Sequence, residues 1–216
     1  MATGIVIVVG MLKGGSGKTT TAMFTGLTYA QRGRRVLLLD GDQTSQSAYD
    51  WSQLAAAAGE PLPFTVERYP FEDIAAHIDR ARTEWDVVIV DAGGGSATYL
   101  EEAVSAADLL LIPTAPAAAD TRRLAATLAS ATRGADRNSR GVSAVMVMVR
   151  ADHRTGQPAS WRDQLVADGH TLAATDIRDL VLYSDAYGHT PPHAGEYPAL
   201  LAEVGLLDDE AEVPAR

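Results

Sequence analysis

A glycine-rich segment near the start of the chain has the residue types and spacing that bind phosphate groups. It reads Lys13-Gly14-Gly15-Ser16-Gly17-Lys18-Thr19, follows an apolar run over 5–9 and leads into a helical pattern. Glycines let successive backbone N–H groups point at phosphate oxygens, and the positive end of the following helix adds to their attraction. The lysine of such a loop reaches the β- and γ-phosphates, and the next hydroxyl binds Mg²⁺. The segment therefore predicts a nucleotide site.

Lysine usage points to the same segment. The chain has 18 basic residues, and Lys13 and Lys18 are its two lysines, so the rest of the chain uses arginine. A compact ammonium on a flexible stem fits a phosphate site where a planar guanidinium does not.

Acidic side chains end two of the predicted buried strands. Asp40 follows the apolar run 36–39, Asp42 comes two residues later, and Asp91 follows the run 87–90. Ligands of parallel sheets bind beyond the carboxyl ends of the strands. We therefore expect these carboxylates and the glycine loop to meet at one edge of the sheet.

The elements that must position these residues alternate along the chain. We expect strands over 4–10, 36–39, 64–68, 87–90, 109–112, 142–149 and 171–175, and helices over 18–31, 45–58, 71–84, 99–106, 120–132, 161–167, 179–187 and 197–204. This order predicts an α/β fold with a mostly parallel sheet and helices on both faces. We expect one domain over 1–207 and an acidic tail over 208–216.

Composition excludes several classes of protein. Cysteine is absent from the 216 residues, which excludes disulfides, thiolate metal sites and cysteine nucleophiles. No apolar run reaches the length of about 18 residues that a membrane span needs, and the N-terminus lacks the basic flank of a signal peptide, so we expect a cytoplasmic protein. The net charge of −10 opposes general attraction to nucleic acid, but residues 120–162 hold eight Arg and three Asp.

One departure from the general phosphate-loop pattern makes the interpretation more specific. Leu12 stands where that pattern has its first glycine, and Lys13 precedes the glycine pair. The stretch Lys-Gly-Gly-x-Gly-Lys-Thr-Thr resembles the deviant Walker A loop of the ParA/MinD family of ATPases. The resemblance implies a P-loop NTPase fold, ATP and Mg²⁺ as cofactors, Mg²⁺-dependent ATP hydrolysis and an ATP-bound homodimer in which Lys13 reaches the partner's nucleotide. It implies nucleotide contacts from Lys13, Gly14, Gly15, Ser16, Gly17, Lys18, Thr19 and Thr20.

Two acidic motifs extend the resemblance. The segment from Leu37 to Gln43 resembles the second motif of that family, which implies that Asp42 orients the attacking water and that Asp40 belongs to the outer shell of the metal. The segment 85–91 resembles a Walker B strand, which implies that Asp91 holds Mg²⁺ through water, with Thr19 as a direct ligand. Phosphoryl transfer needs positioning and charge stabilisation more than a strong base.

The loops after both acidic motifs depart from the family. Gln43-Thr44 replaces the usual Pro-Gln, and Ala92-Gly93-Gly94-Gly95 replaces the usual Thr-Pro-Pro. Three successive glycines predict a mobile loop.

The second half of the chain resembles partition ATPases in the segments 106–114, 152–155, 175–178 and 183–188. The resemblance therefore covers nearly the whole chain. It implies base contacts from Arg150, Ile177 and Arg178, with a surface or DNA-facing role as the alternative for Arg150. Few residues precede the first strand, so we expect a short ParA-type protein without an N-terminal DNA-binding domain.

The resemblance implies a nucleoid-associated ATPase. Its ATP-bound dimer would bind DNA without sequence preference and drive plasmid or chromosome partition with a ParB-like adaptor. Candidate DNA contacts are Arg122, Arg123, Arg133, Arg137, Arg140 and Arg154, and scattered solvated arginines are the alternative. The acidic C-terminal segment opposes binding to anionic membranes.

Three other functions stay open. The same ATPase could position a protein cargo, the fold could serve an ATP-dependent small-molecule ligase, or the altered loops could give a dimer that does not hydrolyse ATP.

Overall fold

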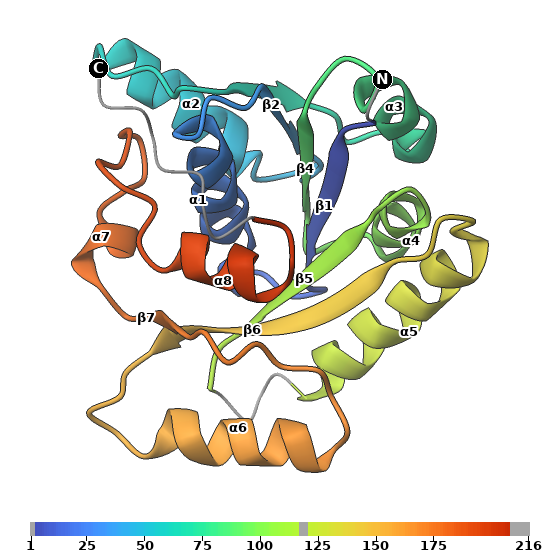
Figure 1. The fold of residues 1–216 in the computed structure, drawn as a ribbon, viewed down its shortest axis with the longest axis vertical. Coiled ribbons are helices and arrows are strands. Elements are labelled where there is room, and N and C mark those ends of the chain that lie inside the picture. Colours follow the sequence, from blue (N-terminus) through green and yellow to red (C-terminus); the bar gives the residue numbers. More distant parts are fainter. Residues whose placement is uncertain (1–2, 117–120, 208–216) are drawn as a thin grey trace.

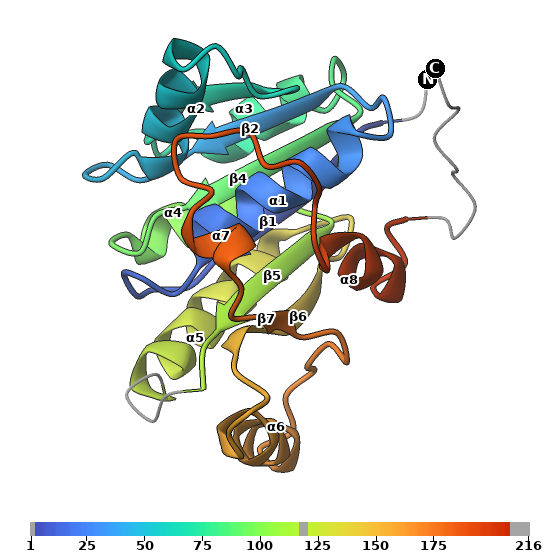
Figure 2. The same ribbon diagram turned by 90° about the vertical axis from the view of Figure 1, so that its left-hand side faces the viewer.

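The computed structural model describes residues 3–116 and 121–207, except for the side chains of residues 121 and 122. Seven parallel strands form one sheet in the order β3-β2-β4-β1-β5-β6-β7. Helices α1, α2, α7 and α8 cover one face and α3, α4 and α5 cover the other, while α6 lies beyond the β6–β7 edge (Figures 1 and 2). The predicted α/β class, with a parallel sheet between helices, is confirmed.

The central strands are apolar because helices cover both of their faces. The strands are β1 (Ile5–Gly10), β2 (Val36–Asp40), β3 (Thr65–Arg68), β4 (Val87–Ala92), β5 (Leu109–Thr114), β6 (Ser143–Ala151) and β7 (Ile177–Arg178). Every residue of β2, β4 and β5 is buried, whereas β3 is largely exposed at one edge of the sheet. Strand order reverses at β1, which lies between β4 and β5, and this is where parallel sheets form ligand crevices.

The helices supply the second layer on each face. They are α1 (Lys18–Ala30), α2 (Ser47–Ala57), α3 (Ile74–Ala81), α4 (Ala97–Ser105), α5 (Thr121–Arg137), α6 (Gln157–Ala167), α7 (Val181–Ser184) and α8 (Tyr197–Glu203). The Ser96 hydroxyl caps α4 by accepting a hydrogen bond from the backbone N–H of Tyr99 at 3.1 Å. Within the described residues, no helix is both long and apolar enough to cross a membrane.

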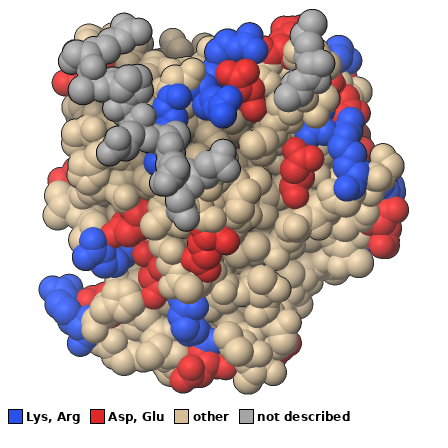
Figure 3. Space-filling model, in the orientation of Figure 1, with Lys and Arg blue, Asp and Glu red and all other residues tan. Residues whose placement is uncertain are grey.

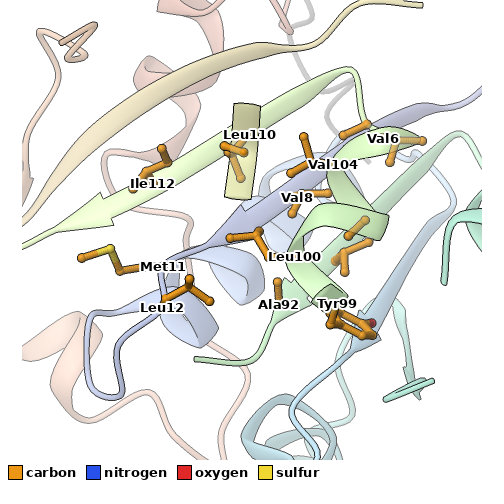
Figure 4. Close-up of a cluster of buried hydrophobic side chains, with 14 of the residues drawn as sticks. Val6, Val8, Met11, Leu12, Ala92, Tyr99, Leu100, Val104, Leu110 and Ile112 are labelled. Carbon is orange, nitrogen blue, oxygen red and sulfur yellow. The ribbon is translucent and has the colours of Figure 1, made fainter. Parts of the chain in front are cut away.

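Leu12, which replaces the glycine of the general phosphate-loop pattern, belongs to the core under α4 and α5. Figure 4 shows Met11 and Leu12 beside the cluster formed by Leu100, Leu110 and Ile112. The backbone N–H of Leu12 also donates to the buried Thr127 hydroxyl of α5 at 3.0 Å. A buried leucine therefore anchors the start of the loop where the general pattern has a glycine.

The expected strand over 171–175 is wrong. Only Leu172 forms an isolated bridge, with Met146, and the last strand is Ile177–Arg178. Side chains form hydrogen bonds with the backbone between Leu172 and Ile177. The Arg162 guanidinium donates to the Ala173 carbonyl, and the Glu203 carboxylate accepts from the backbone N–H groups of Ala174 and Thr175. These bonds replace a strand ladder.

The helices in the second half also differ from the expected bounds. Helix α5 continues to Arg137, α6 begins at Gln157 with a proline in its first turn, and the helix expected over 179–187 is only Val181–Ser184. The chain after α7 instead lies on α2, where the Trp51 indole N–H donates to the His189 carbonyl at 2.7 Å. The predicted tail, 208–216, lies outside the described residues, so its separation from the domain remains a prediction.

The contact between α4 and α5 predicts the effect of adding one methyl group. A Cβ atom at Gly134 would lie 2.6 Å from the Glu101 carbonyl oxygen and 2.8 Å from Val104 Cβ. We expect Gly134→Ala to lower the free energy of unfolding by about 1–3 kcal/mol, although alanine raises helix propensity by about 0.5–1 kcal/mol. Gly95→Ala is the control, because a Cβ there meets nothing within 4 Å. Urea denaturation measures both variants, and a stabilised Gly134→Ala would contradict this packing.

Candidate active site

The glycine loop lies at the carboxyl end of β1 and ends where α1 begins. Gly15 and Gly17 have φ angles of 70° and 89°, in the left-handed region that favours glycine. Gly17 is the N-cap of α1, so the free N–H groups and the positive end of this helix face the loop. The loop residues Gly14 to Thr20 line a pocket of about 360 Å³, together with Asp42 and Asp91.

Lys18 is buried within this loop. Its Nζ atom donates a hydrogen bond to the Lys13 carbonyl at 2.8 Å, and the side chain is 7% exposed. Burial lowers the pKa of Lys18, while the negative charges of Asp91 and Asp42 oppose that shift. The ammonium is therefore held beside two carboxylates at the floor of the pocket.

Asp91 at the end of β4 is joined to the glycine loop through Thr19. The Thr19 hydroxyl donates to Asp91 Oδ2 at 2.7 Å, and the other oxygen, Oδ1, is a buried atom without a hydrogen-bond partner in the described structure. Burial raises the pKa of Asp91 to about 7, against the opposing hydrogen bond from Thr19.

The residues around Asp91 fit a magnesium ion held mainly by phosphate oxygens. The described residues contain no group of three or more His, Cys, Asp or Glu that could hold a metal ion. Mg²⁺ keeps several waters and is usually bound by one or two carboxylates plus substrate phosphates, so it does not require such a group. The unpartnered Asp91 Oδ1 and the Thr19 hydroxyl are suitable for that limited role.

Asp42 lies at the rim of the pocket on the loop that follows β2. Its Oδ1 atom accepts hydrogen bonds from two backbone N–H groups, those of Thr44 and Ser45, both at 2.8 Å. Desolvation raises the pKa of Asp42, but these bonds and the charge of Lys18 outweigh it, so the pKa is lowered. Asp42 therefore carries a stable negative charge at the pocket.

Asp40 is fully buried beside Asp91, its direct neighbour in the β2–β4 ladder. Burial raises the pKa of Asp40, and hydrogen bonds from two backbone N–H groups, those of Tyr49 and Asp42, oppose that shift. The carboxylates expected from the sequence are thus gathered at one edge of the sheet, while their roles remain predictions.

The glycines after β4 have a packing reason that the sequence did not reveal. A Cβ atom at Gly93 would lie 2.7 Å from Asp42 Cα, and one at Gly94 would lie 2.9 Å from the Lys13 carbonyl. Their close approach to both other loops explains two of the three glycines.

A second pocket, of about 400 Å³, adjoins the first and shares Gly17, Thr20, Arg150, Tyr183 and Ser184 with it. Its lining includes Arg150, Ile177 and Arg178, the residues expected to contact the base. Arg150 has a φ angle of 53° at an irregularity in β6, and its Nη1 donates to the Gly15 carbonyl at 3.1 Å. It therefore joins the second pocket to the glycine loop, and a DNA-facing role is not needed to explain its position.

Aromatic residues at this site were missed from the sequence. Trp51 and Tyr187, with ring centroids 5.6 Å apart, line the phosphate pocket, and Tyr183 lines both pockets. Tyr183 and Arg178 both bond the Glu196 carboxylate. A helical pattern and a family resemblance gave these residues no role, because only folding brings 51 and 183–187 beside the loop.

Four of the six arginines expected to bind DNA are paired with carboxylates in the described part of the chain. Arg133 pairs with Glu101, Arg137 with Glu102, Arg140 with Asp79 and Arg154 with Asp152. Arg123 is exposed on α5, and the side chain of Arg122 lies outside the described residues. On the face shown in Figure 3, basic and acidic side chains lie side by side. The charge of these arginines is thus largely balanced locally.

The sheet order and the loop place the chain among P-loop NTPase folds with the deviant Walker A loop of the ParA/MinD family. The model of a family described as VirC1 protein matches residues 5–132, more than half of the chain, and the chain belongs to that family.

Curated relatives agree with this assignment. A protein named ParA from Rhizobium radiobacter is 39% identical over 117 residues, which are 53% of this chain and 50% of that protein. A VirC1 protein from Rhizobium rhizogenes is 34% identical over 106 residues, or 47% of this chain and 45% of that protein. The chain thus aligns with about half the length of these relatives.

Solved structures share the fold at low sequence identity. Cobyrinic acid a,c-diamide synthase from Mycobacterium smegmatis, with a bound ATP analogue and magnesium, has a TM-score of 0.68 at 19% identity over 86% of this chain and 91% of its own. The ATP complex of a McdA variant from Cyanothece has a TM-score of 0.68 at 17% identity over 96% and 99%. At such identities the likeness establishes the fold alone.

The raised pKa of Asp91 predicts a pH-dependent effect in the nucleotide-free and metal-free protein. A folded pKa of about 7, above the ordinary 3.8, means that this group stabilises the fold below about pH 4 and loses that contribution as the pH rises to about 7. We expect Asp91→Asn to have a higher free energy of unfolding than the parent at pH 8, by on the order of 4 kcal/mol, with the gain vanishing near pH 4.

Asp42→Asn is the matched control, since the pKa of Asp42 is lowered and its replacement should give no gain at pH 8. Thermal unfolding across the pH range measures both variants. Equal gains for the two variants would show that burial of Asp91 is not the cause.

Proposed function

We propose that this protein is a ParA-like ATPase. It binds ATP with Mg²⁺, forms a homodimer across the nucleotide, binds DNA without sequence preference and drives partition of a DNA cargo with a ParB-like adaptor. The observation that carries the proposal is the convergence of Lys18, Thr19, Asp42 and Asp91 on one pocket beneath a loop that begins with Lys13.

The two adjoining pockets support ATP as the ligand. The pocket at the loop offers N–H groups, Lys18 and Thr19 to a phosphate chain, and the second pocket offers the apolar side chain of Ile177 and the ring of Tyr183 to a base. Structures with the same fold hold an ATP analogue with magnesium, or ATP. ATP therefore suits the shape and chemistry of this site.

Each side chain has a defined task in the proposed hydrolysis. Lys18 stabilises charge on the phosphate oxygens, Asp42 orients the attacking water, and Thr19 with Asp91 holds the metal and its waters. When bound, Mg²⁺ would neutralise negative charge on the phosphates. Lys13 of one subunit contacts the nucleotide of the other, so the site is complete only in the dimer.

Partition is favoured over the other functions by the family and its relatives. The fold also serves a synthetase, so the fold by itself does not separate the two classes. Lys13 and the matches to ParA and VirC1 favour the dimerising class. A protein cargo is the second candidate, because a carboxysome-distribution protein from Synechococcus elongatus is 52% identical over 46 residues, 21% of this chain and 18% of that protein.

The two lysines should have separable effects. We expect Lys18→Ala to abolish ATP binding, because it removes the buried cation of the phosphate pocket. We expect Lys13→Ala to bind ATP but to lose ATP-dependent dimerisation and to hydrolyse ATP at least about tenfold more slowly, and Asp42→Ala to dimerise without turnover. Light scattering, nucleotide titration and phosphate release measure these properties. A Lys13→Ala dimer with normal turnover would refute the cross-subunit role.

DNA binding should depend on ATP and on salt. We expect co-sedimentation with DNA in ATP but not in ADP or without nucleotide, and a steep loss between about 50 and about 200 mM salt. The Arg133–Glu101 pair allows a sharper test: Arg133→Gln should weaken binding and Glu101→Gln, which releases the guanidinium, should strengthen it.

Arg35→Gln is the control for this experiment, because Arg35 pairs with Asp86 just before β2 and β4 and lies outside the arginine-rich segment. DNA binding that is absent in ATP, or that does not respond to salt, would remove DNA from the proposal.

A further inference from the structure

Asp40 makes its contacts with backbone groups rather than with the pocket. The residue is fully buried at the end of β2. Its Oδ1 atom accepts a hydrogen bond from the Asp42 N–H at 3.1 Å, and its Oδ2 atom accepts one from the Tyr49 N–H at 2.9 Å. Both carboxylate oxygens are therefore bonded to the chain, whereas Asp91 has an oxygen without a partner.

The second of these bonds compensates for a missing helix cap. Helix α2 begins at Ser47, and its N-cap residue, Gln46, has a left-handed φ of 45° and makes no side-chain capping bond. The first N–H groups of a helix need acceptors, and a negative charge near them is favourable. Asp40 supplies both from the neighbouring strand, because the backbone N–H of Tyr49 in the first turn of α2 bonds its carboxylate.

The first bond fixes the loop that carries Asp42. Asp40 binds the N–H of Asp42, and the carboxylate of Asp42 in turn binds the N–H groups of Thr44 and Ser45. Asp40 thus holds both ends of the segment between β2 and α2, which is the segment that presents Asp42 to the phosphate pocket.

We propose that Asp40 is a positioning residue: it fixes the Asp42 loop and the start of α2 through backbone N–H groups, in place of the outer-shell metal role that the family resemblance implies. The capping part of this inference stands independently, and the effect on turnover rests on the proposed function of Asp42.

Amide hydrogen exchange of the nucleotide-free protein tests the capping directly. Asparagine has the shape of aspartate but lacks its charge and one acceptor oxygen. We expect Asp40→Asn to speed exchange over 42–50 by about tenfold or more, in line with the strength of a hydrogen bond to a charged group, and to leave exchange in α1 unchanged. Unchanged exchange over 42–50 would overturn the inference.

A second variant separates positioning from general stability. Gln46→Gly removes the left-handed strain at the N-cap, so Asp40→Asn/Gln46→Gly should recover the melting temperature of the parent. We expect this double variant still to turn over ATP at least about tenfold more slowly at saturating ATP and Mg²⁺, because the Asp42 loop remains loose. Parent-like turnover in the double variant would overturn the positioning role.

Magnesium titration distinguishes the two roles of Asp40. A positioning residue predicts a lower kcat with the same half-saturating Mg²⁺ concentration, whereas an outer-shell residue predicts a several-fold higher Mg²⁺ requirement and unchanged exchange. If the parent neither bound nor hydrolysed ATP, the proposed function would fail, and the exchange result would still decide the capping.

Discussion

Burial of charge at the carboxyl ends of β1, β2 and β4 governs the design of the site. Lys18, Asp40 and Asp91 are each at most 7% exposed. A buried charge is stable only when opposite charges or hydrogen bonds surround it. Lys18 obtains these from the Lys13 carbonyl and two carboxylates, Asp91 from Thr19, and Asp40 from backbone N–H groups. The three strands must therefore end in register, as the Asp40–Asp91 pair shows.

Close approach of the three loops follows from this burial. Gly94 lies against Lys13 and Gly93 lies against Asp42, so the three loops are in direct contact. Arg150 joins the same group from β6 through its bond to the Gly15 carbonyl. The site is thus formed by loop backbones that pack directly against one another and are joined by a few side-chain hydrogen bonds.

Charge on the outside is arranged differently. Three arginines of the arginine-rich segment in the second half of the sequence pair with carboxylates of neighbouring helices: Arg133 with Glu101, Arg137 with Glu102 and Arg140 with Asp79. Exposed pairs of this kind contribute little stability and are screened by salt, so their guanidinium groups can be exchanged between a carboxylate and a phosphate. The number of arginines in this segment therefore overstates the unpaired positive charge that it places on the surface.

The α/β class, the phosphate loop and the strand-end carboxylates could be predicted from the sequence, because buried parallel strands and glycine-lysine loops have local patterns that do not depend on distant residues. The sequence pattern misplaced the last strand, since the Arg162 and Glu203 side chains bind the backbone there, and it gave no role to Trp51 or Tyr183. The fold was needed to show that Asp40 bonds the first turn of α2, that Arg150 lines two pockets and that several arginines are paired. These features depend on contacts between residues far apart in the chain, and such contacts leave no pattern in the local sequence.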